Sequence, residues 1–187
     1  KEEGVCSICG AKVTRDSGKK LNATIKVNAK TLPLKVKQKT SALKVSGLAN
    51  GDYVKSWKSG NKKIFTVSNK GVIKAGKKTG KATLTITLAS GLKKKVTVKV
   101  QKGKVTTKKI SGLKSKVTLK KGKKLTLKPV RTPVTSTQKF TYSTSNKKVA
   151  TVNSKGVITA KKAGKVKITV KSGKKKFTVT VTVTKLP

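Results

Sequence analysis

Few residue types in this chain of 187 residues could do chemistry, and lysine is by far the commonest of them. Histidine is absent, and the only acids are Glu2, Glu3, Asp16 and Asp52. General acid–base catalysis draws on histidine, carboxylates, or a tuned lysine, cysteine or tyrosine, and metal sites need histidine, cysteine or carboxylate ligands. Serine and threonine often adjoin lysine, but no segment sets such a pair apart as a catalytic dyad. We therefore predict a protein that is not an enzyme, with no catalytic residue, no metal site and no cofactor.

The two cysteines form the segment Cys6-Ser-Ile-Cys9-Gly10, which is similar to half of a zinc knuckle. A structural zinc site needs four ligands, and no further cysteine or histidine follows. Two alternatives stay open: partner ligands that precede Lys1, or a local disulfide in an oxidising medium. We interpret residues 1–20 as the tail of a preceding module or a linker. Methionine is absent as well, so we expect a mature product or a piece of a longer protein whose upstream domains are partners of this one.

Lysine dominates the charge of the chain. Lysine and arginine total 49 residues against 4 acids, a formal net charge of +45, and only Arg15 and Arg131 are arginines. Solubility needs a net charge of only about 2–8 for a small domain, and self-repulsion at this density opposes the compact state. A polyanionic partner would account for the excess. Because lysine is a point charge without the planar fork of arginine, we expect diffuse neutralisation and no sequence-specific reading of nucleic acid.

The lysines that we single out for polyanion binding lie in short runs between apolar segments. They are Lys62, Lys63, Lys93, Lys94, Lys95, Lys147, Lys148, Lys174, Lys175 and Lys176.

The apolar residues alternate with polar ones along most of the chain. Valines 179, 181 and 183 alternate with threonines, as do the apolar residues of 83–88. This period of two, with β-branched residues, predicts antiparallel sheets packed face to face. No apolar run approaches the roughly 20 residues that span a bilayer, so we expect no transmembrane segment.

The chain also repeats itself. The segment Trp57–Ala75 matches Tyr142–Ala160, and the strands that follow each segment match as well. We predict one domain over 21–101 and a second over 102–187. In each repeat a glycine, Gly71 or Gly156, stands between two apolar runs and predicts a hairpin turn in the left-handed region.

The segments Ser145–Ala160 and Ala163–Ile168, followed by a closing Thr-Val-Thr-Val strand, resemble the bacterial Ig-like domain of group 2. The resemblance implies an all-β fold of two tandem immunoglobulin-like β-sandwiches on a secreted or surface-attached bacterial protein. It implies no particular ligand. The lysine-rich pair also resembles Ig-like pairs on surface proteins of Gram-positive gut clostridia, so we expect an extracellular place on the surface or cell wall of a Gram-positive bacterium.

Three hypotheses of function follow. The leading one is a non-catalytic module that attaches a secreted protein to anionic cell-wall polymers of the teichoic-acid type by distributed lysine charge. The second is a passive spacer that presents an upstream catalytic or adhesive domain. The third is a carbohydrate-binding or adhesin module in which Trp57 contacts the glycan, although a packing role for Trp57 and its repeat partner Tyr142 is favoured because aromatic residues dominate small cores.

Overall fold

The structure is a computed structural model that describes residues 2–5, 12–15 and 23–185. Every regular element in these ranges is a β-strand. The same ranges contain no helix with the length and apolar character to cross a membrane.

The first strands stand apart from the rest of the fold. β1 (Glu2–Val5) and β2 (Lys12–Arg15) pair antiparallel in a two-stranded sheet of their own. Cys6 and Cys9 lie outside the described residues, and the zinc and disulfide alternatives therefore stay predictions.

Residues 23–101, called unit 1 below, form a sandwich of a four-stranded and a three-stranded sheet with a small two-stranded sheet beside them. The four-stranded sheet has the order β4-β11-β10-β7, the three-stranded sheet β5-β9-β8, and the small sheet β3-β6. The strands are β3 (Lys26–Val27), β4 (Thr31–Lys35), β5 (Lys39–Thr40), β6 (Val45–Ser46), β7 (Val54–Ser59), β8 (Phe65–Val67), β9 (Ile73–Ala75), β10 (Gly80–Leu88) and β11 (Lys93–Gln101).

Residues 102–185, called unit 2, repeat this arrangement strand for strand. The sheets have the orders β13-β20-β19-β16, β14-β18-β17 and β12-β15. The strands are β12 (Lys109–Ser111), β13 (Lys116–Lys120), β14 (Lys124–Thr126), β15 (Val130–Thr132), β16 (Phe140–Thr144), β17 (Ala150–Val152), β18 (Val157–Ala160), β19 (Gly164–Ser172) and β20 (Lys175–Thr184). The prediction of two tandem all-β sandwiches is confirmed.

Each unit has its own apolar core, built from the inward residues of the alternating strands. In β20 the buried residues Val179, Val181 and Val183 alternate with threonines, and in β11 Val96, Val98 and Val100 alternate in the same way. The core of unit 1 gathers around Phe65 and Ile73, and that of unit 2 around Ile158 and Ile168. Burial of these side chains contributes roughly 25 cal/mol per Å² of apolar surface removed from water.

One aspect of the sheets differs from the prediction of antiparallel pairing. β4 runs parallel to β11, and β13 runs parallel to β20. The alternation of apolar and polar residues is the same in parallel and antiparallel strands, so it indicates which face is buried and carries no information on direction. The first long strand of each unit lies beside the last one after the chain has crossed the sandwich, and this places both in the same direction.

The hairpin glycines adopt the predicted conformation. The φ angle is 73° at Gly71 and 76° at Gly156. In unit 1 the turn closes with a hydrogen bond from the Gly71 N–H to the Ser68 carbonyl, 3.0 Å, and unit 2 has the same bond from Gly156 to Asn153, also 3.0 Å. A side chain at either position would meet strain in the left-handed region.

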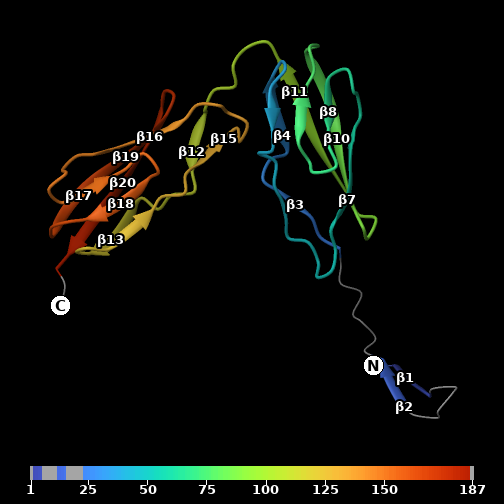
Figure 1. Ribbon diagram of the computed structural model, residues 1–187, viewed down its shortest axis with the longest axis horizontal. Coiled ribbons are helices and arrows are strands. Elements are labelled where there is room, and N and C mark those ends of the chain that lie inside the picture. The colour runs from blue at the N-terminus through green and yellow to red at the C-terminus, as the bar shows by residue number, and fades with distance from the viewer. Residues whose placement is uncertain (1, 6–11, 16–22, 186–187) are drawn as a thin grey trace.

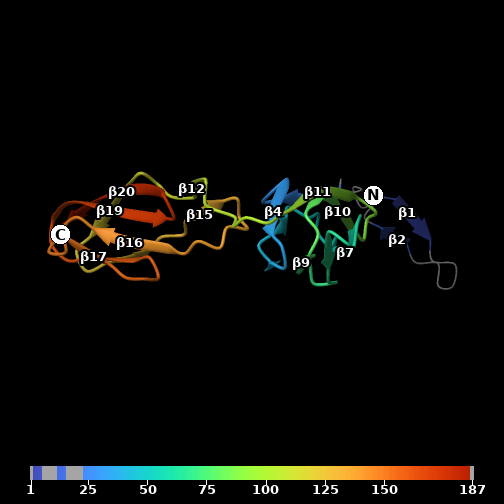
Figure 2. The same cartoon turned by 90° about the horizontal axis from the view of Figure 1, so that it is seen from above.

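The two units follow one another along the long axis of the molecule, and one segment of the chain connects them (Figure 1; Figure 2). The loop between β15 and β16 contacts unit 1 directly. The Thr135 hydroxyl donates to the Pro33 carbonyl at 2.5 Å, and the Gln38 side-chain amide donates to the Thr135 carbonyl at 2.8 Å. Val134 packs against the core of unit 1, and Thr135 is only 2% exposed. These contacts connect the β15–β16 loop of unit 2 directly to unit 1.

Candidate polyanion-binding surface

The outward side of the four-stranded sheet of unit 1 is lined with lysine and threonine. In β11 the residues between the buried valines point away from the core and are exposed, and the neighbouring strands place the same residue types beside them. We call this surface the outer face of unit 1. Its lysines are Lys35, Lys58, Lys81, Lys93, Lys95 and Lys99.

Unit 2 presents the same kind of outer face. Lys165 and Lys167 of β19 alternate with buried apolar residues, so their side chains project from the sheet about 7 Å apart. β20, the neighbour of β19, and β13, the next strand beyond β20, add further lysine and threonine. The lysines of the outer face of unit 2 are Lys116, Lys120, Lys165, Lys167, Lys171 and Lys176.

The strand registers interleave most of these lysines with threonine. Thr180 lies between Lys167 on one side and Lys116 on the other, and Thr182 lies opposite Lys165. Like charges directly opposite each other destabilise a sheet, and threonine between them reduces this cost. The interleaving is incomplete, because Lys171 lies opposite Lys176, as Lys81 does opposite Lys99 in unit 1. A polyanion laid across the face would relieve the repulsion that remains.

The structure brings only some of the predicted lysines onto these faces. Lys93 and Lys95 belong to the outer face of unit 1, and Lys176 belongs to that of unit 2. Lys94 lies opposite the buried Ile86, and Lys175 lies opposite the buried Ser172. Both lysines are therefore on the inner side of their sheets, near the end of the strand, and do not belong to the outer faces.

The other predicted lysines lie in exposed turns. Lys62 and Lys63 follow β7, Lys147 and Lys148 follow β16, and Lys174 is in the hairpin before β20. The turn after β7 and the β10–β11 hairpin lie at different ends of the sheet, because Ser59 pairs with Leu84 whereas Val54 pairs with Leu88. The predicted lysines therefore form no single cluster.

Sequence reasoning missed the lysines that are spread through the strands, such as Lys165 and Lys167. A signal for them was present, because they alternate with the apolar residues that predicted the strand. The prediction was based on runs of consecutive lysines, and most of these runs lie in turns.

Carboxylates are nearly absent around the lysines. Asp52 is the only acidic residue between 23 and 185. It accepts hydrogen bonds from the Ser90 hydroxyl at 2.7 Å and from the Tyr53 N–H at 2.9 Å. The bond from the Ser90 hydroxyl is the largest of the effects that lower the pKa of Asp52. The lysines of unit 2 thus have no carboxylate side chain within their own unit.

Trp57 and Tyr142 serve the packing of the hairpins that contain Gly71 and Gly156. Trp57 is half-buried against the core of unit 1, and a Cβ added at Gly71 would lie 2.7 Å from its Cζ2 atom. Its repeat partner Tyr142 covers Gly156 in the same way, at 2.9 Å from its Cζ. Trp57 also lies opposite the buried Ile86, so its ring is on the inner side of β7. Packing therefore accounts for the contacts of both rings, and a glycan contact of Trp57 remains a prediction.

Arg131 is the one arginine among the described side chains, and it is held in unit 2. Its guanidinium lies 5.0 Å from the centre of the Phe140 ring and donates a hydrogen bond to the Gln138 carbonyl. Partial burial raises the pKa of the nearby Tyr142, and the charge of Arg131 opposes this effect. Arg131 thus anchors the loop between β15 and β16.

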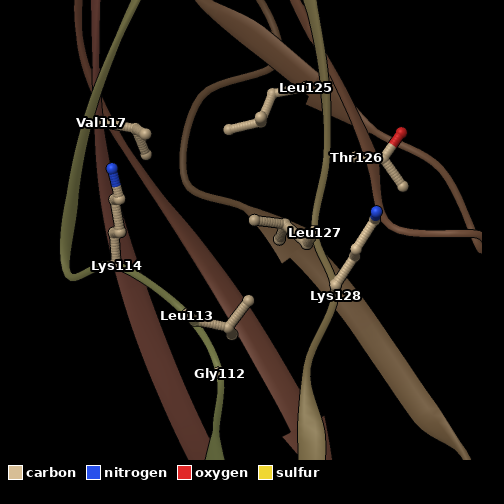
Figure 3. A pocket seen from close by; sticks show the side chains of 8 residues that line it. All are labelled: Gly112, Leu113, Lys114, Val117, Leu125, Thr126, Leu127 and Lys128. Carbon is tan, nitrogen blue, oxygen red and sulfur yellow. The ribbon is translucent and has the colours of Figure 1, made fainter. Parts of the chain in front are cut away.

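An apolar groove of about 250 Å³ opens at the edge of unit 2 between the loop after β12 and strand β14 (Figure 3). Leu113, Val117 and Leu125 are half-buried there, and the lysines beside them are Lys114 and Lys128.

No group of three or more potential metal-ligating side chains comes together in residues 2–5, 12–15 and 23–185. The chemistry that the described surface offers is positive charge.

Comparison with known proteins gives one family and a set of similar folds. Residues 104–183 match the family described as Bacterial Ig-like domain (group 2). Domains 5–6 of the S-layer protein SbsC are 24% identical, with a TM-score of 0.42 over 88% of this chain and 98% of that structure. Domains 1–6 of surface layer protein SbsC are 23% identical, with a TM-score of 0.42 over 70% of this chain, which spans 20% of that longer structure.

Drosophila N-cadherin EC1-3 is also similar, at 8% identity and a TM-score of 0.45 over 87% of this chain and 68% of that one. Curated proteins give no match.

Proposed function

Because residues 104–183 are a bacterial Ig-like domain of group 2, we propose that this protein is a non-catalytic cell-surface module. It attaches a secreted bacterial protein, of which it is a part, to anionic cell-wall polymers of the teichoic-acid type. The parent is on the surface of a Gram-positive bacterium. The contacts are made by the lysines of the two outer faces, and the polymer is held by charge without a single deep site.

The observation that carries the proposal is the pair of outer faces. The same sheet position in both units exposes lysine interleaved with threonine, and unit 2 contains no acid that would neutralise it. A net charge of +45 far exceeds what solubility requires. Binding of a flexible polyanion to such a face is driven by counterion release, so its affinity falls steeply as salt rises.

The proposal is tested by sedimentation of the protein with purified Gram-positive cell walls over a salt series. We expect retention at low salt, release at high salt, and loss of retention from walls stripped of teichoic acid. Equal retention on stripped walls would overturn the proposal.

A matched pair of variants tests the face itself. Replacing Lys165, Lys167 and Lys171 with glutamine removes three charges from the outer face of unit 2. Replacing Lys147, Lys148 and Lys155 removes the same charge from turns. For a polymer that behaves like a single-stranded polyanion, log K falls with log salt at a slope of roughly −0.7 per contact, so each lost contact makes this slope less steep by roughly 0.7. We expect a less steep salt dependence for the face variant than for the turn variant. Equal salt dependences would mean that the outer face contributes no more to binding than the turns do.

The spacer hypothesis is supported by a different observation, the contacts at the joint. Hydrogen bonds from Thr135 and Gln38 connect the units directly, and a fixed joint suits a module that projects an upstream domain. A protein that bound no envelope polymer at any salt concentration, yet kept a fixed angle between its units in small-angle scattering, would favour this second function.

A further inference from the structure

A hollow of about 590 Å³ lies at the end of unit 2, beside the segment of chain that enters this unit from unit 1. It is lined by residues of three segments: the entering chain, the loop between β15 and β16, and the hairpin between β19 and β20. These residues are Thr106, Thr107, Lys108, Gln138, Lys174 and Lys175.

Thr107, which lines the hollow, belongs to a network of buried hydroxyl groups. The Thr107 Oγ1 atom lies 2.9 Å from the Ser136 Oγ and 2.8 Å from the Ser172 Oγ. The Ser172 hydroxyl in turn donates to the Gln138 carbonyl at 3.1 Å. Thr107, Ser136 and Ser172 are 5%, 4% and 1% exposed. Buried hydroxyls that satisfy one another form a rigid base, which preorganises the groups above it.

The Gln138 side chain is held on this base in one orientation. The Thr107 N–H donates to Gln138 Oε1 at 2.6 Å. Because a backbone N–H requires an acceptor, the oxygen of the carboxamide must face Thr107, and the NH₂ group must face the other way. Gly173 leaves the room for this group, since a Cβ there would lie 2.3 Å from both Oε1 and Nε2. No residue of the described part of the chain accepts a hydrogen bond from Gln138 Nε2.

Positive charge surrounds the free amide. Lys108, Lys174 and Lys175 are exposed and line the hollow, and Arg131 donates to the backbone carbonyl of Gln138. Acceptor-rich anions bind where fixed N–H donors and ammonium groups converge. Unit 2 contains no carboxylate side chain that would compete for these donors.

We infer that the hollow binds one tetrahedral oxyanion, a phosphate or sulfate group, through the Gln138 amide and the ammonium groups of Lys108, Lys174 and Lys175. The inference rests on the proposed function in one respect, because it takes the group to be carried by the bound polymer. The hollow would then fix the position of a chain that the outer faces hold only by distributed charge.

The corresponding hairpin of unit 1 has the opposite chemistry. Gly91 has open space around it, with no atom within 4 Å of an added Cβ. The group beside this hairpin is the Asp52 carboxylate, which accepts from the Ser90 hydroxyl and N–H. A carboxylate repels an oxyanion, so the site belongs to unit 2 alone.

The test is titration of the whole protein with inorganic phosphate and, separately, inorganic sulfate at about 0.15 M salt, where the Debye length is about 8 Å and distant charges are screened. The readout is the NMR resonance of the Gln138 side-chain NH₂ together with the dissociation constant. The test variant is Gln138→Glu, which keeps an oxygen for the Thr107 N–H and replaces the free donor with a second oxygen.

The matched control is Asn153→Asp in the β17–β18 hairpin. It changes the net charge equally, and its Oδ1 atom likewise accepts backbone N–H groups, from Lys155 at 3.0 Å and from Val157 at 2.9 Å. We expect the affinity for the anion to fall at least tenfold in Gln138→Glu and less than twofold in Asn153→Asp. Equal changes in the two variants, or a Gln138 resonance that does not move, would overturn the inference.

A second pair of variants leaves the buried network intact. Lys174→Gln with Lys175→Gln removes charge from the hollow, and Lys147→Gln with Lys148→Gln removes it from an exposed turn. We expect only the first pair to weaken anion binding.

Cell-wall sedimentation separates this inference from the proposed function. If phosphate binds weakly and equally to all variants while wild-type protein still sediments with walls, the hollow is disproved and the attachment function stands. If wild-type protein never sediments but phosphate binds in the way described, the attachment fails and the hollow stands. Phosphodiester polymers and sulfated polysaccharides, compared in the same assay, identify the source of the group.

Discussion

Units 1 and 2 have the same strand order, but they differ at the first edge of the long sheet. In β4 of unit 1, Leu32 and Leu34 are completely buried. Their counterparts in β13 of unit 2 are Val117 and Leu119, and both are only half-buried. The groove of Figure 3 opens beside Val117, so unit 2 leaves open a place that unit 1 fills.

The loops differ as much as this edge does. The β10–β11 hairpin of unit 1 meets the Asp52 carboxylate, whereas the β19–β20 hairpin of unit 2 meets the Gln138 carboxamide. In unit 1 the Gln38 side chain reaches across the joint, and its counterpart Lys123 in unit 2 is exposed. The comparison shows that the repeat preserves the sandwich while the groups around its ends are free to acquire different chemistry.

The largest expected effect comes from truncating the two edge leucines. Leu34→Ala removes a fully buried side chain and should lower the free energy of unfolding of unit 1 by about 2–5 kcal/mol. Leu119→Ala removes a half-buried one and should cost unit 2 about 1 kcal/mol. Trp57 is the only tryptophan, so its fluorescence during urea unfolding reports on unit 1, and amide hydrogen exchange in β19 and β20 reports on unit 2. Equal losses would show that the two edges are packed equally well.

Much of this fold is predictable from the sequence, because its strands and turns are encoded by residues that are close together in the chain. Alternation identified the strands, the repeat identified the two units, and Gly71 and Gly156 identified the hairpins. The parallel pairing of β4 with β11 was not predictable, because side-chain alternation is independent of strand direction.

The candidate site was predictable only in part. Composition led to the proposal of a polyanionic partner, but the outer faces assemble strands that are far apart in the chain, such as β13 and β20. The hollow depends on the orientation of one carboxamide over one glycine, Gln138 over Gly173. No local pattern contains that information.

The second prediction concerns the glycines of the hairpins. Gly71→Ala places a Cβ in the left-handed region, φ 73°, and 2.7 Å from the Trp57 ring. We expect unit 1 to lose about 2–3 kcal/mol, from backbone strain of about 1–2 kcal/mol and from displacement of the ring. Gly91→Ala has a similar φ of 86° but open space, so the loss should be about 1 kcal/mol. The unfolding midpoint of Trp57 fluorescence measures both, and identical shifts would show that the ring contact carries no energy.

The third and smallest effect tests the acidic hairpin of unit 1 by titration. The Ser90 hydroxyl, foremost among the hydrogen bonds to Asp52, holds the pKa of that carboxyl below its ordinary value. A lowered pKa means that the folded state favours the carboxylate, so its contribution to stability is complete above the ordinary pKa and disappears as the pH falls through the folded pKa. Ser90→Ala should therefore move the pKa of Asp52 upward, toward its ordinary value, as followed by the carboxyl carbon resonance in an NMR pH series. Ser154→Ala, in an exposed hairpin of unit 2, should leave this titration unchanged. If both variants titrate like the wild type, the hydroxyl does not lower the pKa of the carboxylate. The β10–β11 and β19–β20 hairpins then differ only in the charge of the side chain beside them, Asp52 or Gln138.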